Sequence, residues 1–484
     1  MGQTDWDVVI IGAGISGLNF GYRLREAHPH LNFCILEGRH ELGGTWSLFK
    51  FPGIRSDSNL YEFSFPWHSW TYPSTIAQGA LILDYLKEAA SKSGLQDYIR
   101  LNNRVEHIHW RTSARSWTLD VSHDGIVSSM TCRFILLGTG YYNYKDPLPA
   151  LIPGLANFQG PVVHPQFWPA DLDCAGKRVV VIGSGSTAVT MLPSLATQAG
   201  HVTMLQRSPS YIIPVPQNSP VARFVRNWFP SSKLATALLR FQTILFSLVV
   251  VTFCRRLPSL ARPWLLGIVR SQLPAGTDVD PHFTPRYDPW RQRMCMTPDG
   301  DFFRALGDGS ASVATGVIQT VMPRGIRLES GAEIPADVIV TATGLRLRAF
   351  GGMRVSVDDQ AFDVTDHFIW KAAMIEGLPN LVLSIGYADS SWTLGADVAA
   401  LLACRLLAEM EAEGVSMIAP RLSASDKANM ATLPLLDLTS TYIREGLASV
   451  PKSSDRPQWR PRSYYWKDLV EATWGDVRTG LERS

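Results

Sequence analysis

The sequence predicts an α/β protein with two Rossmann-like dinucleotide-binding domains, the second inserted into the first and carrying a helical excursion. Three observations lead to this prediction. Two buried apolar runs each end in a glycine-rich turn, the residues that close the following strands differ in charge, and two similar strand endings flank the second unit. The length of 484 residues fits two or three domains.

The first unit is the stretch DVVIIGAGISG near the N-terminus. We expect residues 7–11 to form a buried parallel strand. Gly12, Gly14 and Gly17 then allow a tight turn, a close approach of the backbone to a pyrophosphate and close helix packing. Glu37 ends the next expected strand, twenty residues after Gly17, where its carboxylate can accept hydrogen bonds from a ribose.

The second unit, RVVVIGSGSTAVT, has an expected strand at 179–182 followed by Gly183, Gly185 and Ala188. Its next strand ends in Arg207, nineteen residues after Ala188. A carboxylate would repel a 2′-phosphate, whereas a guanidinium binds one in a fork; the alternative is an arginine that is merely solvated at a strand end. The acidic first unit and basic second unit together predict FAD, held permanently, and NADPH, which exchanges.

The domain order follows from two strand endings, FILLGTGYYNY and VIVTATGL, which stop at glycines on either side of the second unit. The NADPH domain is therefore expected as an insertion into the FAD domain. The final 35 residues are expected to form an irregular, basic tail on the surface. The predicted parts are the FAD domain over 1–145, a linker over 146–175, the NADPH domain over 176–335 with a helical excursion over 213–290, and the second part of the FAD domain with the tail over 336–484.

A helix is predicted from Trp392 to Glu413, because apolar residues recur there at helical spacing. Its N-terminus could direct the positive end of the helix dipole at a flavin. Ordinary core packing accounts for the helix equally well, so both interpretations stay open.

Composition restricts the function classes. The net charge is only +2 and 46% of the residues are hydrophobic, which argues against nucleic acid as a partner and for a small-molecule enzyme. Six scattered cysteines with no CxxC pair argue against a disulfide framework, a metal site or a dithiol redox centre. The N-terminus runs straight into an expected strand and leaves no room for a signal region, so the cytoplasm is the expected location.

One segment, residues 241–254, is almost entirely apolar and is flanked by arginines. Its 14 residues are fewer than the roughly 20 that span a bilayer. One alternative is a buried helix or channel wall. The other is a surface helix that makes a peripheral membrane contact and admits apolar substrates.

The loop ELGGTWSLFKFPGIRSDS concentrates special residues directly after Glu37. Its paired glycines permit close backbone approach, Trp46 offers a flat apolar face, and a Pro-Gly turn delivers Arg55 and Asp57. We therefore expect this loop to wrap a ligand.

Four stretches in the same order, GAGISG, GGTWSLFKFPGIRSD, FQGPVVHPQFWP and GSGSTA, resemble the type I Baeyer–Villiger monooxygenases of the class B flavin-containing monooxygenase superfamily. The resemblance covers nearly the whole chain and looks closest to the ethionamide-activating group. It implies FAD and NADPH as cofactors. The positions that it and the two turns assign to cofactor binding, besides those named above, are Ser16, Gly44, Thr45, Ser56, Val105, Gly140, Ser186, Thr187, Ser208 and Trp392.

The resemblance also implies three functional side chains. His164 lies in the linker and would couple the motions of the two nucleotide sites. Arg293 would stabilise a C4a-peroxyflavin and contact the nicotinamide, and Asp57 would orient it. Many relatives carry Lys immediately before this arginine, where this chain has Gln292, so NADPH selectivity would depend more on Arg207.

The implied reaction inserts one oxygen atom of O2 into a hydrophobic ketone, giving an ester or lactone. The alternative substrate is a thioether or amine, oxygenated at sulfur or nitrogen by the same flavin intermediate. A flavin disulfide reductase would need a dithiol, which the sequence lacks, and a non-catalytic redox sensor would not need Arg293 and Asp57 together.

Overall fold

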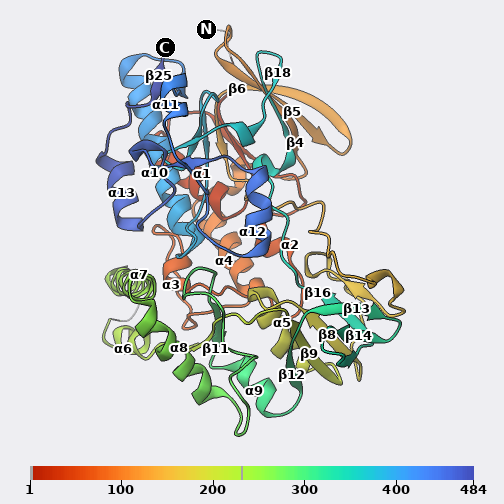
Figure 1. Cartoon of the computed structure of the whole chain (residues 1–484). Helices are drawn as coiled ribbons and strands as arrows, with labels where there is room; N and C mark the ends of the chain where they lie inside the picture. Colours follow the sequence, from red (N-terminus) through yellow and green to blue (C-terminus); the bar gives the residue numbers. More distant parts are fainter. Residues whose placement is uncertain (1–3, 230–232) are drawn as a thin grey trace.

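The two predicted nucleotide-binding units fold around separate sheets in the computed structural model, which describes residues 4–229 and 233–484 (Figure 1). The first three residues, part of the N-terminal stretch discussed above, lie outside the described residues. The larger sheet has nine strands in the order β18-β17-β4-β5-β6-β1-β2-β3, with β21 also paired to β6. The smaller sheet has five, in the order β12-β9-β8-β16-β7. The predicted α/β class is confirmed.

The larger sheet has a parallel part that carries the first glycine-rich turn and an antiparallel part beside it. Residues 8–11 and 134–137 are fully buried apolar runs, as strands covered on both faces require. The strands are β1 (Trp6–Ile11), β2 (Phe33–Leu36), β3 (Ile99–Arg100), β4 (Arg104–Arg111), β5 (Ser116–His123), β6 (Ile126–Leu137), β17 (Arg354–Val357), β18 (Gln360–Ala361) and β21 (Leu381–Leu383).

The smaller sheet is parallel throughout and carries the second glycine-rich turn. Its strands are β7 (Val162–Val163), β8 (Arg178–Ile182), β9 (His201–Gln206), β12 (Ala311–Thr315) and β16 (Val338–Thr341). Because β16 pairs with β7 and β8, the chain returns to the first sheet only after Thr341, and the predicted boundary at 336 is too early. The strand β7, from the predicted linker, also belongs to this sheet.

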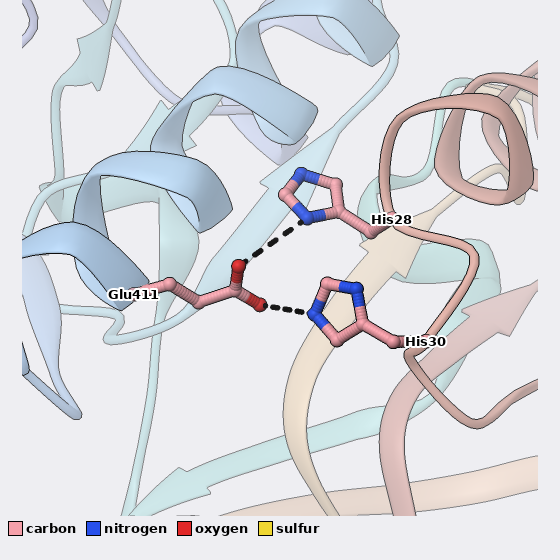
Figure 2. Close-up of side chains that lie close together, drawn as sticks. All are labelled: His28, His30 and Glu411. Carbon is pink, nitrogen blue, oxygen red and sulfur yellow. Dashed lines mark hydrogen bonds and ion pairs between the residues drawn. The ribbon is translucent and has the colours of Figure 1, made fainter.

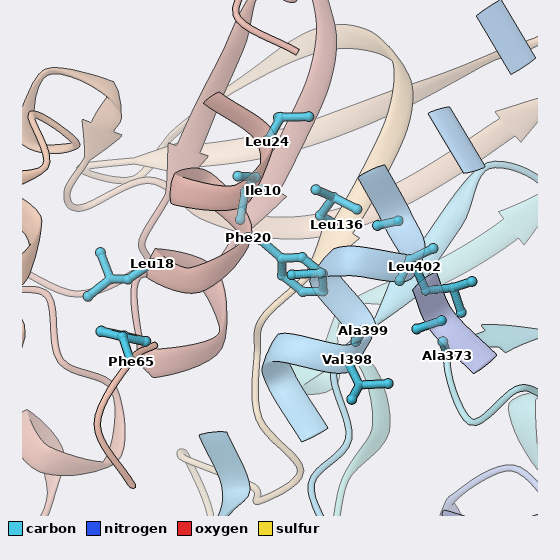
Figure 3. Packing of buried hydrophobic residues seen from close by; sticks show 14 of the residues in the cluster. Ile10, Leu18, Phe20, Leu24, Phe65, Leu136, Ala373, Val398, Ala399 and Leu402 are labelled. Atoms are coloured by element: carbon cyan, nitrogen blue, oxygen red, sulfur yellow. The ribbon is translucent and has the colours of Figure 1, made fainter. Parts of the chain in front are cut away.

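Two helices cover one face of the larger sheet and form its core with it. The helix α1 (Ile15–Ala27) follows the first glycine turn, and α10 (Trp392–Glu413) occupies the residues predicted for it. Figure 3 shows Phe20 of α1 packed between Leu136 of β6 and Ala399 of α10. The predicted helix is therefore confirmed as a buried core element.

A polar contact also joins these two helices (Figure 2). Glu411 of α10 pairs with His30 at 3.0 Å and with the buried His28, the residue that caps the C-terminus of α1, at 3.6 Å. The other ring nitrogen of His28 donates to the Cys404 carbonyl. The contacts with Glu411 and this hydrogen bond hold the C-terminal end of α1 against α10.

The predicted helical excursion consists of α6 (Pro220–Trp228), α7 (Lys233–Arg256) and α8 (Pro258–Gln272), the green helices at one corner of Figure 1. The apolar segment 241–254 lies within α7. Phe241, Phe246 and Val249 are more than half exposed, so the interpretation of this segment as a buried helix or channel wall is wrong for its outer face. The sequence pattern could not show this, because both faces of the helix are apolar.

The C-terminal tail is more regular than predicted. The helix α13 (Tyr465–Trp474) packs on α10, and β25 (Leu481–Arg483) pairs antiparallel with β22 (Ile418–Pro420). Helices and strands that position the site are α2 (Thr45–Leu48), α3 (Leu60–Phe63), α4 (Gly79–Lys92), α5 (Ser186–Ala196), β11 (Cys295–Pro298), α9 (Asp301–Gly307) and α12 (Thr441–Gly446).

Candidate active site

A cleft with a volume of about 620 Å³ lies where the first glycine turn meets the N-terminus of α5. Both sheets contribute to it, since its walls include Gly12 and Glu37 from the larger sheet and Ser186 at the start of α5 from the smaller one. The predicted site residues that line it are Gly12, Gly14, Ser16, Glu37, Gly44, Thr45, Trp46, Arg55, Ser56, Asp57, Val105, Gly140, Ser186, Thr187, Arg293 and Trp392.

The first glycine turn is packed too closely against neighbouring backbone for side chains at Gly12 and Gly17. Gly12 has a φ of +99°, and a Cβ there would lie 2.7 Å from the Gly138 carbonyl oxygen. Gly17 faces away from the cleft and packs so closely on the Gly12 carbonyl that any Cβ would collide with it. The 13-residue helix α1 starts at this turn, so its free N–H groups face the cleft at the position where a dinucleotide phosphate binds.

Glu37 is the acidic group of this turn. Its Oε2 accepts the Ala13 N–H at 2.8 Å and its Oε1 accepts the Arg39 N–H at 3.1 Å. Burial raises the pKa of Glu37, and the two backbone N–H groups partly offset that effect. Each carboxylate oxygen has two lone pairs, so capacity remains for ribose hydroxyls.

Aromatic side chains form the wall beside the N-terminus of α10. Trp392 stacks on Tyr141 with ring centres 4.5 Å apart, and the hydroxyls of Tyr141 and Tyr142 are hydrogen-bonded. The Trp392 indole donates to Ser16 Oγ at 3.2 Å. The prediction did not include the two tyrosines, although they directly follow Gly140 in GTGYYNY.

Arg293 lies just before β11 and brings a cation to the cleft. One nitrogen, Nη1, is 3.6 Å from Asp57 Oδ1, and Nη2 donates to the carbonyls of Tyr387 at 3.4 Å and Ser390 at 3.2 Å. Burial tends to lower the pKa of Arg293, but Asp57 and nearby tyrosines leave it raised. About a third of the side chain remains exposed, so it stays charged and accessible from the cleft.

Asp57 joins the two halves of the site. Besides Arg293, it accepts a hydrogen bond from Ser186 Oγ, at the start of α5, at 3.0 Å. Three segments therefore meet at one carboxylate: the glycine-rich loop after β2, the start of α5 and the residues just before β11.

The loop that supplies carbonyls to Arg293 is itself held by two acids that the sequence analysis missed, the buried Glu62 and the largely buried Asp389. Glu62 accepts the Ser391 N–H at 2.8 Å and the Ser247 hydroxyl at 2.9 Å, and Asp389 pairs with Arg255 at 3.2 Å. Burial raises the pKa of both acids. Ser247 and Arg255 belong to α7, so this helix contacts the residues that hold the loop around Arg293. Only the three-dimensional fold brings these residues together.

The guanidinium of Arg55 makes an ion pair that the sequence did not predict. It forms a two-point ion pair with Asp301 at the start of α9, one contact of which is 3.3 Å, and the Arg55 side chain is only 9% exposed. Arg55 also lines the cleft, so its ion pair joins the loop after β2 to α9 at the edge of the predicted site.

The remaining predicted residues lie around the second glycine turn, outside the cleft: Gly183, Gly185, Ala188, Arg207 and Ser208. A Cβ on Gly183 would lie 2.3 Å from the Ala342 carbonyl, whereas the space above Gly185 is open. Ala188 is buried within α5. Arg207 is exposed and donates to Thr441 at 3.3 Å. Since β8 and β9 are neighbours, Gly183 and Arg207 follow the same edge of the sheet.

His164 lies at the linker between the sheets. Its Nδ1 accepts the Gln166 N–H at 3.2 Å, and Gln166 in turn donates to the Asn143 carbonyl at 2.7 Å. Burial lowers the pKa of His164, and the nearby Gly344 backbone partly opposes that. Gly344 lies in the segment that leads from β16 back to the larger sheet. The histidine therefore lies beside both segments that connect the two sheets.

Comparisons with known proteins agree with this geometry. The model of the flavin-binding monooxygenase-like family matches residues 6–221. The chain is 41% identical over 464 residues to the FAD-containing monooxygenase EthA of Mycobacterium tuberculosis, covering 96% of this chain and 94% of that protein. It is 38% identical over 465 residues to the probable FAD-binding monooxygenase AlmA of Acinetobacter baylyi, covering 96% and 92%.

Solved structures share the fold at lower identity. OTEMO in complex with FAD and NADP superposes with a TM-score of 0.74 at 20% identity, covering all of both chains. An oxidised steroid monooxygenase bound to NADP gives a TM-score of 0.73 at 21% identity, covering 99% of each chain.

Proposed function

The chain belongs to the flavin-binding monooxygenase-like family of class B flavoprotein monooxygenases, and on that premise we propose that it uses FAD, NADPH and O2 to insert one oxygen atom beside the carbonyl of an apolar ketone. The product is an ester or a lactone, and the second oxygen atom leaves as water. The observation that best supports this proposal is Arg293, held between Asp57 and two backbone carbonyls on the cleft wall.

FAD supplies the oxygen chemistry when bound and reduced, and the chain's residues hold it in place. The turn at Gly12 and the N-terminus of α1 suit its pyrophosphate, and Glu37 suits its ribose. Trp392 and Tyr141 form an apolar aromatic wall that excludes water.

NADPH is assigned to the second glycine turn. The open space above Gly185 admits a pyrophosphate, and Arg207 offers an exposed guanidinium on the same sheet edge for the 2′-phosphate. Its contact with Thr441 is long and easily exchanged for a phosphate.

Arg293 supplies a fixed positive charge at the reacting centre. Insertion next to a carbonyl requires a nucleophilic, anionic oxidant, and a guanidinium whose pKa is raised cannot donate its proton to that anion. Asp57 and the two carbonyls orient the guanidinium before the substrate arrives, which removes a reorganisation cost from the reaction.

A second candidate activity is oxygenation of sulfur or nitrogen, which needs the protonated form of the same oxidant. We rank ketone insertion first because a cation that cannot release its proton favours the anionic oxidant.

The experiment is a product analysis. The purified yellow protein is given NADPH, ¹⁸O2 and an equimolar mixture of an aliphatic ketone and a dialkyl sulfide. We expect an ester carrying one ¹⁸O atom and NADPH consumption that matches product. Sulfoxide without any ester would reverse the order of the two activities, and NADPH oxidation that yields only hydrogen peroxide with both substrates would contradict the proposal.

A further inference from the structure

The three helices α6, α7 and α8 expose an unusual amount of apolar surface. More than half of the large hydrophobic residues that are exposed among the described residues lie on these helices or their ends, which project at one corner of the molecule (Figure 1). We call this surface the apolar face. It is formed by Val221, Phe224, Trp228, Phe229, Leu234, Leu238, Phe241, Leu245, Phe246, Val249, Leu257, Leu260 and Trp264.

The pattern along α7 separates this face from an ordinary amphipathic helix. Its inner side, which includes Leu239 and Val251, is buried against the protein. The opposite side, where a soluble helix carries polar residues, presents Leu238, Phe241 and Leu245 at helical spacing. Exposed apolar side chains gathered on three neighbouring helices indicate an interaction site.

The charge of this region identifies the partner. Residues 217–277 contain eight arginines and lysines and no aspartate or glutamate. They therefore carry +8, while the whole chain carries +2, which leaves −6 for the remainder. A large apolar surface set among basic residues matches a bilayer with anionic headgroups. A second copy of the chain docked by the same face would bring two +8 regions together.

Contacts on its inner side keep α7 on the protein. The helix is long and apolar enough to cross a membrane by length and composition. However, Arg240 donates to the Glu62 carbonyl, Ser247 donates to the Glu62 carboxylate, and Arg255 pairs with Asp389. The apolar residues between Arg240 and Arg255 span only about 21 Å, less than the roughly 30 Å of a bilayer core.

We propose that the apolar face is a monotopic docking surface for an anionic phospholipid membrane, in which α6, α7 and α8 lie in the interface with their exposed side chains among the acyl chains. The protein would then work from the cytoplasm at the inner membrane surface. The proposal rests on exposure and charge, and it stands independently of the reaction assigned to the cleft.

The test measures binding of the yellow holoprotein to vesicles by sedimentation. Vesicles contain phosphatidylcholine alone or equal parts of phosphatidylcholine and phosphatidylglycerol. We expect binding to the anionic vesicles, weakened by salt. Exchanging the exposed Arg223 and Arg256 for Gln should lower the partition coefficient about thirtyfold, since each basic residue near an anionic surface contributes about one kcal/mol of binding.

The apolar contribution is tested with Phe246→Glu combined with Val249→Glu, side chains that are 63% and 57% exposed. We expect this pair to abolish sedimentation with the anionic vesicles. The matched control is Ile126→Glu with Leu151→Glu, apolar residues away from the face that are even more exposed, at 75% and 95%, and this variant should bind like the original chain. Retained flavin shows that each variant is folded.

Two outcomes would overturn the proposal. One is undiminished vesicle binding by the Phe246 and Val249 variant. The other is an absence of vesicle binding combined with self-association that this variant abolishes, since the face would then be an interface between copies of the chain.

Discussion

Two arginines of the site show how a side chain's partners determine what it can do. Arg293 is held by Asp57 and by two carbonyls, and it is two-thirds buried. Arg207 is exposed and makes one long hydrogen bond, to Thr441. The first arrangement fixes a charge at one point of the cleft, and the second leaves a guanidinium free to bind an arriving phosphate.

Replacing Arg293 with Ala should lower the rate of ester formation by about a hundredfold to a thousandfold, the usual effect of removing one preorganised charge stabiliser. Flavin binding should persist, because the first glycine turn and Glu37 are untouched. Product formation and NADPH consumption are measured together, and we expect NADPH oxidation to become uncoupled from product. Arg291→Ala is the control, since that side chain is exposed only two residues away. Full ester formation by Arg293→Ala would remove the residue from the catalytic site.

Replacing Arg207 with Ala should raise KM for NADPH by about tenfold to a hundredfold, as expected for the loss of charge-assisted hydrogen bonds. KM for NADH, which lacks the 2′-phosphate, should barely change. Steady-state oxidation of both nucleotides measures this difference. Arg327→Ala removes an exposed arginine elsewhere in the NADPH part and should leave both constants unchanged. Equal changes for NADPH and NADH would contradict the assignment.

At the scale of elements, the helix α7 connects the apolar face with the cleft. Its Ser247 binds Glu62, which also accepts the N–H of Ser391 at the start of α10. Its Arg255 pairs with Asp389, in the loop whose carbonyls hold Arg293. The helix α7 therefore forms part of the apolar face and also contacts the residues that hold the loop around Arg293.

Replacing Glu62 with Ala should impair catalysis through Arg293, because the buried Ser391 N–H and Ser247 hydroxyl lose their acceptor, at a cost of about 1–3 kcal/mol of stability. We expect kcat to fall about tenfold to a hundredfold while KM for NADPH is unchanged. Glu62→Gln keeps an acceptor for Ser391 and can donate to Ser247, so it should restore most of the rate. If both variants lose activity in parallel with their melting temperature, the role of Glu62 is only structural.

Local sequence patterns predicted the elements whose buried residues and turns lie within one continuous segment of the chain. The strand and turn at 7–17, the charge contrast of Glu37 and Arg207, and the helix 392–413 are of this kind. The sequence left the burial of the segment 241–254 open between a buried helix and a surface helix, because the inner and outer faces of α7 are both apolar. The ion pair of Arg55 was not predictable, since its partner Asp301 is 246 residues away in sequence.

At the scale of the whole molecule, the two segments of the chain that connect the sheets run side by side. Tyr142 and Leu347 form an antiparallel bridge, the Asn143 N–H donates to the Arg346 carbonyl at 2.7 Å, and the Arg348 N–H donates to the Tyr141 carbonyl at 3.0 Å. This two-stranded connection is one of the places where the two parts are joined. His164 lies beside it, next to the Gly344 backbone.

The buried state of His164 predicts a pH dependence of the whole fold. Because burial lowers its pKa below the ordinary 6.5, the folded protein favours the neutral ring. The stability that this histidine contributes is therefore present above about pH 6.5 and is lost as the pH falls through the folded pKa. His164→Asn retains an acceptor for the Gln166 N–H but cannot titrate. Between pH 7.5 and 5 the melting temperature of the original chain, followed by flavin release, should fall more steeply than that of the variant. Parallel curves would show that the ring takes up its proton in the folded state without cost, and the coupling role proposed for it would then need a different physical basis.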